Sequence, residues 1–231
     1  MATIEDKEFG TIVVRRSSRA SHIRISVAPN GTLRASLPIY APLFSLKRML
    51  SSSREQIRSL LESQRPVYDF HQGMQIGKSH TLIARAAAGS VTRIYRHKQQ
   101  IIAELANSDT LETDAVQKEI REVAMQALRI EAKSYLPKRL AYLASQLDCR
   151  YERVRFSHAS GRWGSCSSSG TISLNIALMK LPHELIDYVI IHELCHTKQM
   201  NHSTEFWKLV ASEDPHYKLH RASLKSHTPT I

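Results

Sequence analysis

Apolar and polar residues alternate in three short runs near the start of the chain, TIVVRR, HIRISV and TLRASL, all within residues 11–37. This alternation is typical of strands that bury one face. Asn30 and Gly31 separate the second run from the third, and both residues tolerate the positive φ of a hairpin turn. We therefore predict three strands, the last two joined as a hairpin.

The hydrophobic spacing lengthens after Pro42. Leucines and isoleucines recur there at helical intervals as far as Glu62, although serines at 51–53 weaken the middle of the predicted helix. For the basic residues of this helix we favour a solvated face over a phosphate-binding one; they are Lys47, Arg48, Arg54 and Arg58. Residues 79–105 return to alternation in HTLIARA, VTRIYRH and QQIIAEL, which predicts three more strands.

The remainder of the chain is mainly helical in pattern. One apolar stripe runs from Val116 to Ile130 and a second from Leu136 to Leu147, and Pro137 should kink or break the helix between them. The polar stretch 107–113 comes just before both stripes. We therefore predict a β-rich N-terminal region with one helix over residues 1–110 and a second domain over residues 111–231.

Two short alternating strands, at 153–157 and 171–176, follow the helical stripes and are joined by the loop HASGRWGSCSSSG. A merely flexible connector has no need of an indole, so Trp163 should either pack on the core or line a site. Further on, Ser203 is a candidate N-cap for a short helix that Pro215 ends.

A histidine-rich stretch at 187–207, DYVIIHELCHTKQMNHSTEFW, carries the candidate chemistry. Apolar residues at helical spacing precede it, so His192 and His196 should lie on one helix, ~40° apart around its axis. Both imidazoles can then bind one metal ion. Glu193 is rotated by ~100° from His192, so it can reach a water on that metal without being a ligand. This arrangement is typical of zinc hydrolases, in which the carboxylate takes a proton from the water.

The third ligand has two candidates. His202 can reach the same metal if the chain folds back soon after His196, and Asn201 is the residue best suited to a left-handed turn there. Glu205 is the rival, because carboxylates fill this role in some zinc enzymes. We favour His202. Cys166 could be a ligand or a switch, but we keep it as a packing residue.

Several polar residues near the motif are candidates for secondary roles. Asp187 and Glu184 could orient the ligand imidazoles. Three further histidines could stabilise an oxyanion, and nothing in the sequence selects among them: His158, His183 and His216. We interpret Cys195, between the two helix histidines, as a small buried apolar residue.

The positive net charge of the chain is compatible with several kinds of binding partner. The net charge is +11, which is compatible with nucleic acid, an anionic membrane or acidic substrates, and equally with an ordinary Lys- and Arg-rich surface. No run approaches the ~20 apolar residues of a membrane span, and the first residues lack a signal-peptide core. Three scattered cysteines favour a reducing cytoplasm over a disulfide framework.

The chain resembles the YgjP-like metallopeptidase family in several segments, with weaker matches in its first half. The segments are RWGSC at 162–166, GTISLN at 170–175, YVIIHELCH at 188–196, NHS at 201–203 and FW at 206–207, and in the first half VVRRSSRASHIRISV, PNGTLRASLP and IGKSHTL. That family is similar around the metal helix to the SprT-like and WLM-type proteases. The resemblance implies an α+β fold, with a zincin-like catalytic domain behind a small β-rich region.

The resemblance also implies a function. His192, His196 and His202 would bind one Zn²⁺ per chain, and Glu193 would be general base and then acid in peptide-bond hydrolysis. The partner would be a peptide or protein, which the strand at 171–176 could align as a sheet edge. Two alternatives stay open: a DNA-associated metalloprotein that acts on DNA-bound proteins, and a metal hydrolase that cleaves another amide or ester.

Overall fold

A computed structural model describes residues 2–28, 31–63 and 68–231 of the chain. Contacts divide the chain into two compact units, Met1–Val67 and Tyr68–Ile231, called here the N-terminal and C-terminal units. We predicted a boundary near residue 110, whereas the contacts place the division 43 residues earlier, because the strands at 75–105 pack on the helix that follows them. Within the described residues, every helix is too short or too polar to cross a lipid bilayer.

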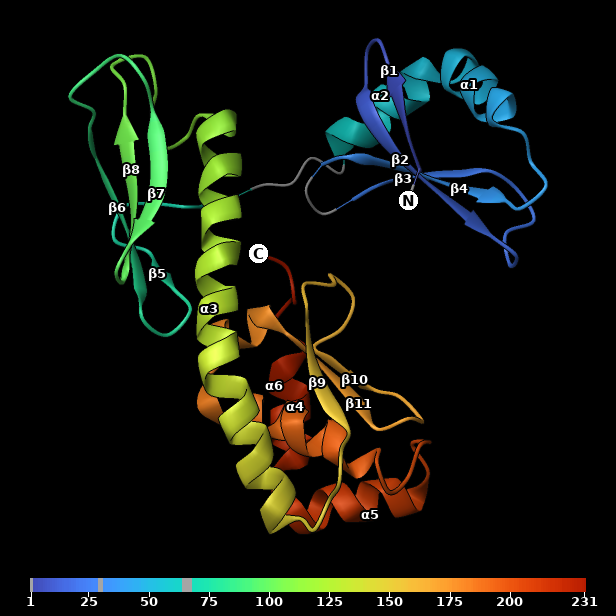
Figure 1. The fold of residues 1–231 in the computed structure, drawn as a ribbon, viewed down its shortest axis with the longest axis vertical. Coiled ribbons are helices and arrows are strands. Elements are labelled where there is room, and N and C mark those ends of the chain that lie inside the picture. Colours follow the sequence, from blue (N-terminus) through green and yellow to red (C-terminus); the bar gives the residue numbers. More distant parts are fainter. Residues whose placement is uncertain (1, 29–30, 64–67) are drawn as a thin grey trace. The chain divides into compact units, whose positions relative to one another are not determined.

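The N-terminal unit is a four-stranded sheet with two helices on one face (Figure 1). Its strand order is β1-β2-β4-β3; β2 and β4 are parallel, and the other two pairs are antiparallel. The three predicted strands are present, and β1 was not predicted. The bounds are β1 Ala2–Asp6, β2 Gly10–Ser17, β3 Arg24–Val27, β4 Leu33–Pro38, α1 Leu43–Ser52 and α2 Arg54–Ser63.

The hydrophobic residues that alternate along these strands form one buried face. Ile12 and Val14 on β2 and Leu33, Ala35 and Leu37 on β4 pack against Leu46, Leu50 and Ile57 of the helices. The predicted hairpin lies between β3 and β4, which are antiparallel, and Gly31 has a φ of 78°. Asn30 lies outside the described residues.

The single predicted helix at 42–62 is two helices. They are separated at Ser53, whose φ of −121° and ψ of 28° are not helical. The serine run that weakens the helical pattern is therefore the position of the break, since serine hydroxyls compete for backbone hydrogen bonds. Ser51 and Ser52 do this by donating to Lys47 O and Met49 O.

The C-terminal unit begins with a second four-stranded sheet, in the order β5-β6-β8-β7, that packs against the long helix α3 (Figure 1). Three of its strands match the predicted ones. The anchor between the sheet and α3 is the buried carboxylate of Glu131, which accepts hydrogen bonds from Lys78 N, Ser79 N, Ser79 Oγ and His80 Nδ1. The bounds are β5 Gln75–Ile76, β6 His80–Ala86, β7 Arg93–His97, β8 Gln100–Leu105 and α3 Asp114–Gln146.

The prediction that Pro137 breaks the helix is wrong, because α3 continues through Pro137 to Gln146. Proline removes one backbone hydrogen bond, at a cost of about 3 kcal/mol in an isolated helix. Burial of Leu136, Leu140 and Leu143 on both sides of the proline outweighs this cost, since burying each leucine contributes about 1.5–3 kcal/mol.

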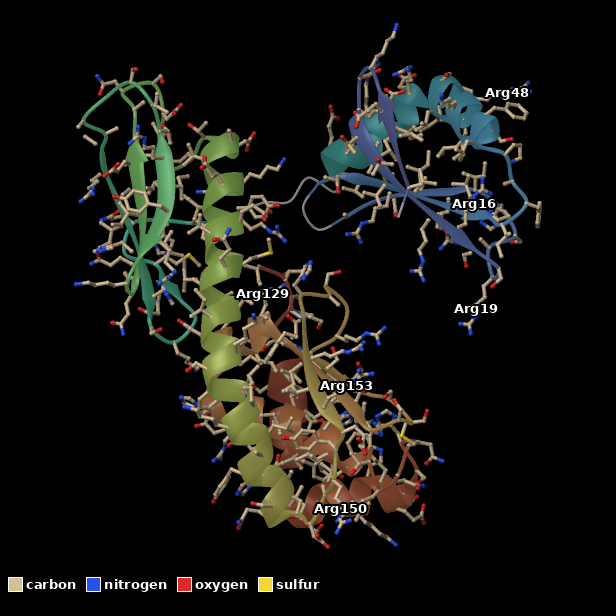
Figure 2. All side chains as sticks on the ribbon, in the orientation of Figure 1. Arg16, Arg19, Arg48, Arg129, Arg150 and Arg153 are labelled. Atoms are coloured by element: carbon tan, nitrogen blue, oxygen red, sulfur yellow. The ribbon has the colours of Figure 1, made fainter. Side chains whose placement is uncertain are left out.

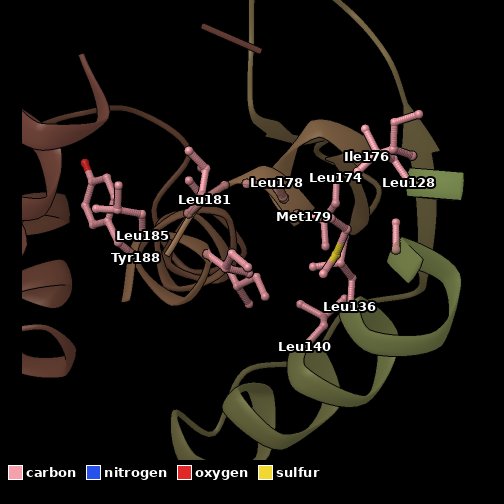
Figure 3. Packing of buried hydrophobic residues seen from close by; sticks show 14 of the residues in the cluster. Leu128, Leu136, Leu140, Leu174, Ile176, Leu178, Met179, Leu181, Leu185 and Tyr188 are labelled. Carbon is pink, nitrogen blue, oxygen red and sulfur yellow. The ribbon is translucent and has the colours of Figure 1, made fainter. Parts of the chain in front are cut away.

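A three-stranded sheet and three further α-helices complete the C-terminal unit. The strand order is β10-β11-β9, with β10 antiparallel and β9 parallel to β11. Leucines of α3 pack against Leu174, Met179 and their neighbours to form one core (Figure 3). The bounds are β9 Arg153–Ser157, β10 Gly164–Cys166, β11 Thr171–Asn175, the 3₁₀ helix η1 Ile176–Lys180, α4 His183–Cys195, α5 Thr204–Glu213 and α6 Tyr217–Leu224.

The strand β11 occupies the centre of this small sheet. The prediction that residues 171–176 form a free sheet edge is therefore wrong. The reason is that part of the Gly- and Ser-rich loop folds back as β10 and pairs with β11, with Ser165 opposite Ser173. The edge strand beside α4 is β10.

Candidate metal centre

The helix α4 places the histidine motif at the junction of the core and a surface pocket. Most of the helix is buried, including Ile190, Ile191 and Leu194, so its position is fixed by packing. His192 and His196 point from this helix to the same place, with their ring centroids 4.9 Å apart. This confirms the predicted helix and the shared orientation of the two imidazoles.

The turn after α4 brings His202 to the same place. His202 Nε2 lies 3.1 Å from His192 Nε2, and the ring centroids of His196 and His202 are 4.7 Å apart. Asn201 does not have the predicted left-handed conformation. Its Oδ1 instead accepts hydrogen bonds from Ser203 N and Gln199 Nε2, which closes the turn.

The helix α5 begins immediately after His202 and holds the turn in place. Ser203 is its N-cap, with Oγ accepting from Phe206 N, as predicted. Phe206 is fully buried and its ring stacks on that of His196, at 4.4 Å between centroids. The third histidine therefore depends on the packing of α5 against α4.

The three imidazoles suit a metal ion by their donor atoms. One nitrogen from each of the three histidines lies within 4.8 Å of the other two. His196 Nδ1 is 3.0 Å from Gln199 O, and a carbonyl only accepts, so this nitrogen carries the proton and Nε2 keeps a lone pair. Burial and the neighbouring histidines lower the pKa of His192 to about 3, which keeps it neutral, as a ligand must be.

Glu193 lies beside the histidines with one oxygen free. Within the described residues, its Oε2 is buried and has no hydrogen-bond partner. Burial raises the pKa of Glu193 to about 7, although the charge of Arg162 and a hydrogen bond from Cys166 N act in the opposite direction. An unpartnered buried carboxylate oxygen is costly for stability, so its retention is typical of a functional group.

A pocket of about 240 Å³ joins these groups to one another. Its wall opposite α4 is the edge strand β10, at Gly164, Ser165 and Cys166. Gly164 is in contact with the Glu193 carboxylate, and a Cβ at residue 164 would lie 2.6 Å from Oε1. The prediction missed Gly164, because the loop motif RWGSC contains this glycine but nothing in a sequence pattern links it to Glu193.

Aromatic rings form layers beside His202. The Trp207 ring stacks on His202 at 5.7 Å and on Tyr217 at 5.5 Å, and the guanidinium of Arg221 lies 4.5 Å from the Trp207 ring centroid. This stacking of rings restricts the His202 imidazole to one orientation. Trp163, the other indole, packs against the core, which is one of its two predicted positions.

Other candidate residues lie outside the histidine cluster. Glu205 is not among the residues that could share the metal with the three histidines. Asp187 forms a bidentate ion pair with Arg139, and His183 Nδ1 is 3.0 Å from Tyr135 Oη, so both have structural partners. Cys195 is buried, as predicted.

Comparisons with known proteins point to one family. A family model described as YgjP-like, metallopeptidase domain matches residues 21–227. The chain is similar to the solved metallopeptidase zymogen of Pyrococcus abyssi abylysin, with 27% identity and a TM-score of 0.37 over 39% of this chain and 91% of that one. For the zymogen of Methanocaldococcus jannaschii jannalysin the identity is 21% and the TM-score 0.32, over 38% and 93%. No similar sequence is found among the curated proteins.

Proposed function

Because the chain belongs to the YgjP-like metallopeptidase family, we propose that it is a zinc-dependent peptidase whose metal is held by His192, His196 and His202. The observation that carries the proposal is the convergence of three imidazoles beside a buried carboxylate with a free oxygen. Metallopeptidases need a divalent metal ion, and three neutral histidines are a set that zinc prefers in catalytic sites. A bound zinc ion would polarise the scissile carbonyl and lower the pKa of water.

Glu193 is the general base in this proposal. Its free Oε2 faces no donor in the described part of the chain, so it is available to accept a proton and later to return it to the leaving amine. The hydrogen bond from Cys166 N fixes the carboxylate beside the histidines. Gly164 leaves the space that this position requires.

The edge strand β10 is the proposed guide for the substrate backbone. Trp163 O accepts from Asn175 N, and Ser167 N donates to Thr171 O, so alternate peptide groups of this strand pair with β11. The peptide groups of Gly164 and Cys166 therefore face away from β11, toward the pocket that both residues line. Because Cys166 N already donates to Glu193, we propose that an extended peptide pairs with this edge at Gly164, beside the metal ligands.

Metal content and proteolysis test the function together. We expect purified protein to contain about one zinc per chain and to digest an unfolded protein substrate. Glu193→Gln should keep the zinc and lose activity by about 10²–10⁴-fold, since a positioned general base contributes that much. Glu205→Gln is the matched control, a glutamate 12 positions on, and should keep both.

The proposal is contradicted if Glu193→Gln keeps full proteolytic activity, or if the protein binds no metal after zinc is supplied.

A series of substrate peptides, each with one N-methyl group at a different position, tests pairing with β10 without altering the enzyme. We expect cleavage to fall at alternate positions only, because neighbouring peptide groups of a strand face opposite ways. A uniform response along the peptide would exclude edge pairing.

A further inference from the structure

The positive charge of this protein is concentrated in the N-terminal unit. Residues 1–67 contain eleven Lys and Arg against five Asp and Glu, which is +6 of the chain's +11 in 67 of its 231 residues. Peptide hydrolysis by the C-terminal unit gives no reason for this asymmetry. The position of the arginines within the unit decides whether they form a binding surface or a dispersed solvated charge.

The acidic residues neutralise one part of the unit and leave another positive. Asp6, the last residue of β1, and Glu8, in the turn that follows, pair with Arg54 of α2, and Glu8 also pairs with Arg58. These ion pairs account for two of the four basic residues that were considered for a phosphate-binding helix face. That alternative is therefore weakened for the helices.

The sheet face that points away from the helices carries arginines without acidic partners. Arg15 on β2 and Arg24 on β3 both lie opposite Ser36 of β4, and Arg34 lies opposite Ser26. The register places these side chains on the face opposite the buried Val14 and Ala35. All three arginines are exposed, and none makes an ion pair within the residues that the structure describes.

A pocket of about 260 Å³ lies at one end of this face, where the chain turns from β2 to β3. Arg19 extends from that turn (Figure 2). Guanidinium, imidazole and hydroxyl groups are the donors that bind phosphate oxygens. Each of these groups is present in the pocket, at Ser17, Arg19, Ser21, His22, Arg24 and Ser36.

An exposed aromatic residue follows at the same end of the sheet. Ser17, in the pocket, is paired with Pro38, and the next residues lead to Tyr40, which is 82% exposed. The loop is held in its projecting position by Arg16 Nη1, which donates to Ile39 O at 2.5 Å and to Ala41 O at 2.7 Å. Exposed rings beside a basic track are the means by which proteins stack unpaired bases.

We propose that this surface of the N-terminal unit binds single-stranded nucleic acid. Arg15, Arg19, Arg24 and Arg34 would follow the phosphates, with one phosphate in the pocket, and Tyr40 would stack a base. A single strand fits better than a duplex, because bases are available for stacking only when they are unpaired. The proposal is separate from the peptidase chemistry and does not depend on the metal site.

The test is fluorescence anisotropy of the full-length protein with 20-nucleotide oligonucleotides of DNA and RNA, single-stranded and duplex, over a series of salt concentrations. We expect the single strand of DNA, of RNA or of both to bind more tightly than the corresponding duplex. Four phosphate contacts predict a slope of log affinity against log salt of about −3, from ~0.7 per contact. Absence of binding at low salt, or tighter binding of both duplexes, would overturn the proposal.

Variants separate this surface from general electrostatic attraction. Arg19→Gln/Arg24→Gln should weaken binding and make the salt slope shallower by about 1.4. Lys118→Gln/Lys133→Gln removes the same charge from exposed positions of α3 and should leave both quantities unchanged. Equal effects of the two double variants would overturn the proposal.

The aromatic contribution has its own pair of variants. Tyr40→Ala should weaken single-strand binding about tenfold, whereas Tyr40→Phe, which keeps the ring, should stay within about twofold of the unmodified protein. If Tyr40→Ala binds as tightly as the unmodified protein, the stacking part of the proposal is wrong. Circular dichroism of each variant controls for folding.

Discussion

Gly164 contacts the carboxylate of Glu193 so closely that a Cβ at residue 164 would lie 2.6 Å from Oε1 and 2.9 Å from Cδ. The φ of Gly164 is not positive, so the glycine is required for space and not for its backbone conformation. The general-base candidate is therefore positioned by a strand that is separate in sequence from its own helix.

Gly164→Ala should move the carboxylate and lower kcat/KM by at least about tenfold, because proton transfer depends on hydrogen-bond distance. Bound zinc should be unchanged, since Glu193 is not a proposed ligand. Gly161→Ala is the control: it lies in the same loop, and its Cβ would have no neighbour within 4 Å. Equal activity of Gly164→Ala and unmodified protein would contradict the prediction.

His202→Ala should lose metal affinity and with it the stabilising effect of zinc. A metal that binds only the folded state raises the free energy of unfolding by about 2.7 kcal/mol at a concentration of 100 Kd. We therefore expect a chelator to lower the Tm of the unmodified protein and to have little effect on His202→Ala. His158→Ala should respond to the chelator as the unmodified protein does, and if His202→Ala also does, His202 is not a ligand.

Glu131→Gln should destabilise the C-terminal unit by about 2–4 kcal/mol, because it removes a buried carboxylate that accepts four hydrogen bonds. Urea unfolding followed by tryptophan fluorescence measures this unit selectively, since both tryptophans, Trp163 and Trp207, lie in it. Unchanged stability would show that Glu131 does not anchor β6 to α3.

The stability difference between Glu131→Gln and the unmodified protein should also depend on pH. Burial raises the pKa of Glu131, but hydrogen bonds from Lys78 N, Ser79 and His80 outweigh this and hold the pKa below the ordinary value of 4.5. A lowered folded-state pKa means that the stabilisation is complete above pH 4.5 and is lost as the pH falls through the folded-state value. The stability difference between Glu131→Gln and unmodified protein should therefore shrink below pH 4.5, and a constant difference would contradict this.

Asn175→Ala should cost about 2–4 kcal/mol of stability, because it leaves buried groups without partners. Asn175 is fully buried; its Nδ2 donates to Ala159 O and Arg162 O, and its Oδ1 accepts from Ala177 N. It thereby holds the loop that leads into β10. Asn107→Ala, at an exposed position, is the control, and equal unfolding midpoints of the two variants would disprove the role.

The histidine cluster was predictable because its members are close in sequence and share a helical period. His192 and His196 are four residues apart, and Ser203 marks the start of the next helix. The contact of Gly164 with Glu193 was not predictable, since it joins two segments 29 positions apart and depends on how β10 folds back.

Local patterns predicted most strands, and tertiary packing decided where the predictions were wrong. Pro137 has a strong local tendency to end a helix, yet burial of Leu136 and Leu140 keeps α3 continuous. The order of strands in a sheet is not encoded in alternation at all, so the central position of β11 and the edge position of β10 needed the structure.

The location of His202 after α4 also affects the order of events during synthesis. A growing chain presents His192 and His196 first, but His202 reaches them only when α5 packs through Phe206 and Val210. The segment up to the end of α5, at Glu213, must therefore leave the ribosome before the three imidazoles can meet. A nascent chain is consequently unable to assemble the three-histidine cluster until α5 has been made and has packed on α4.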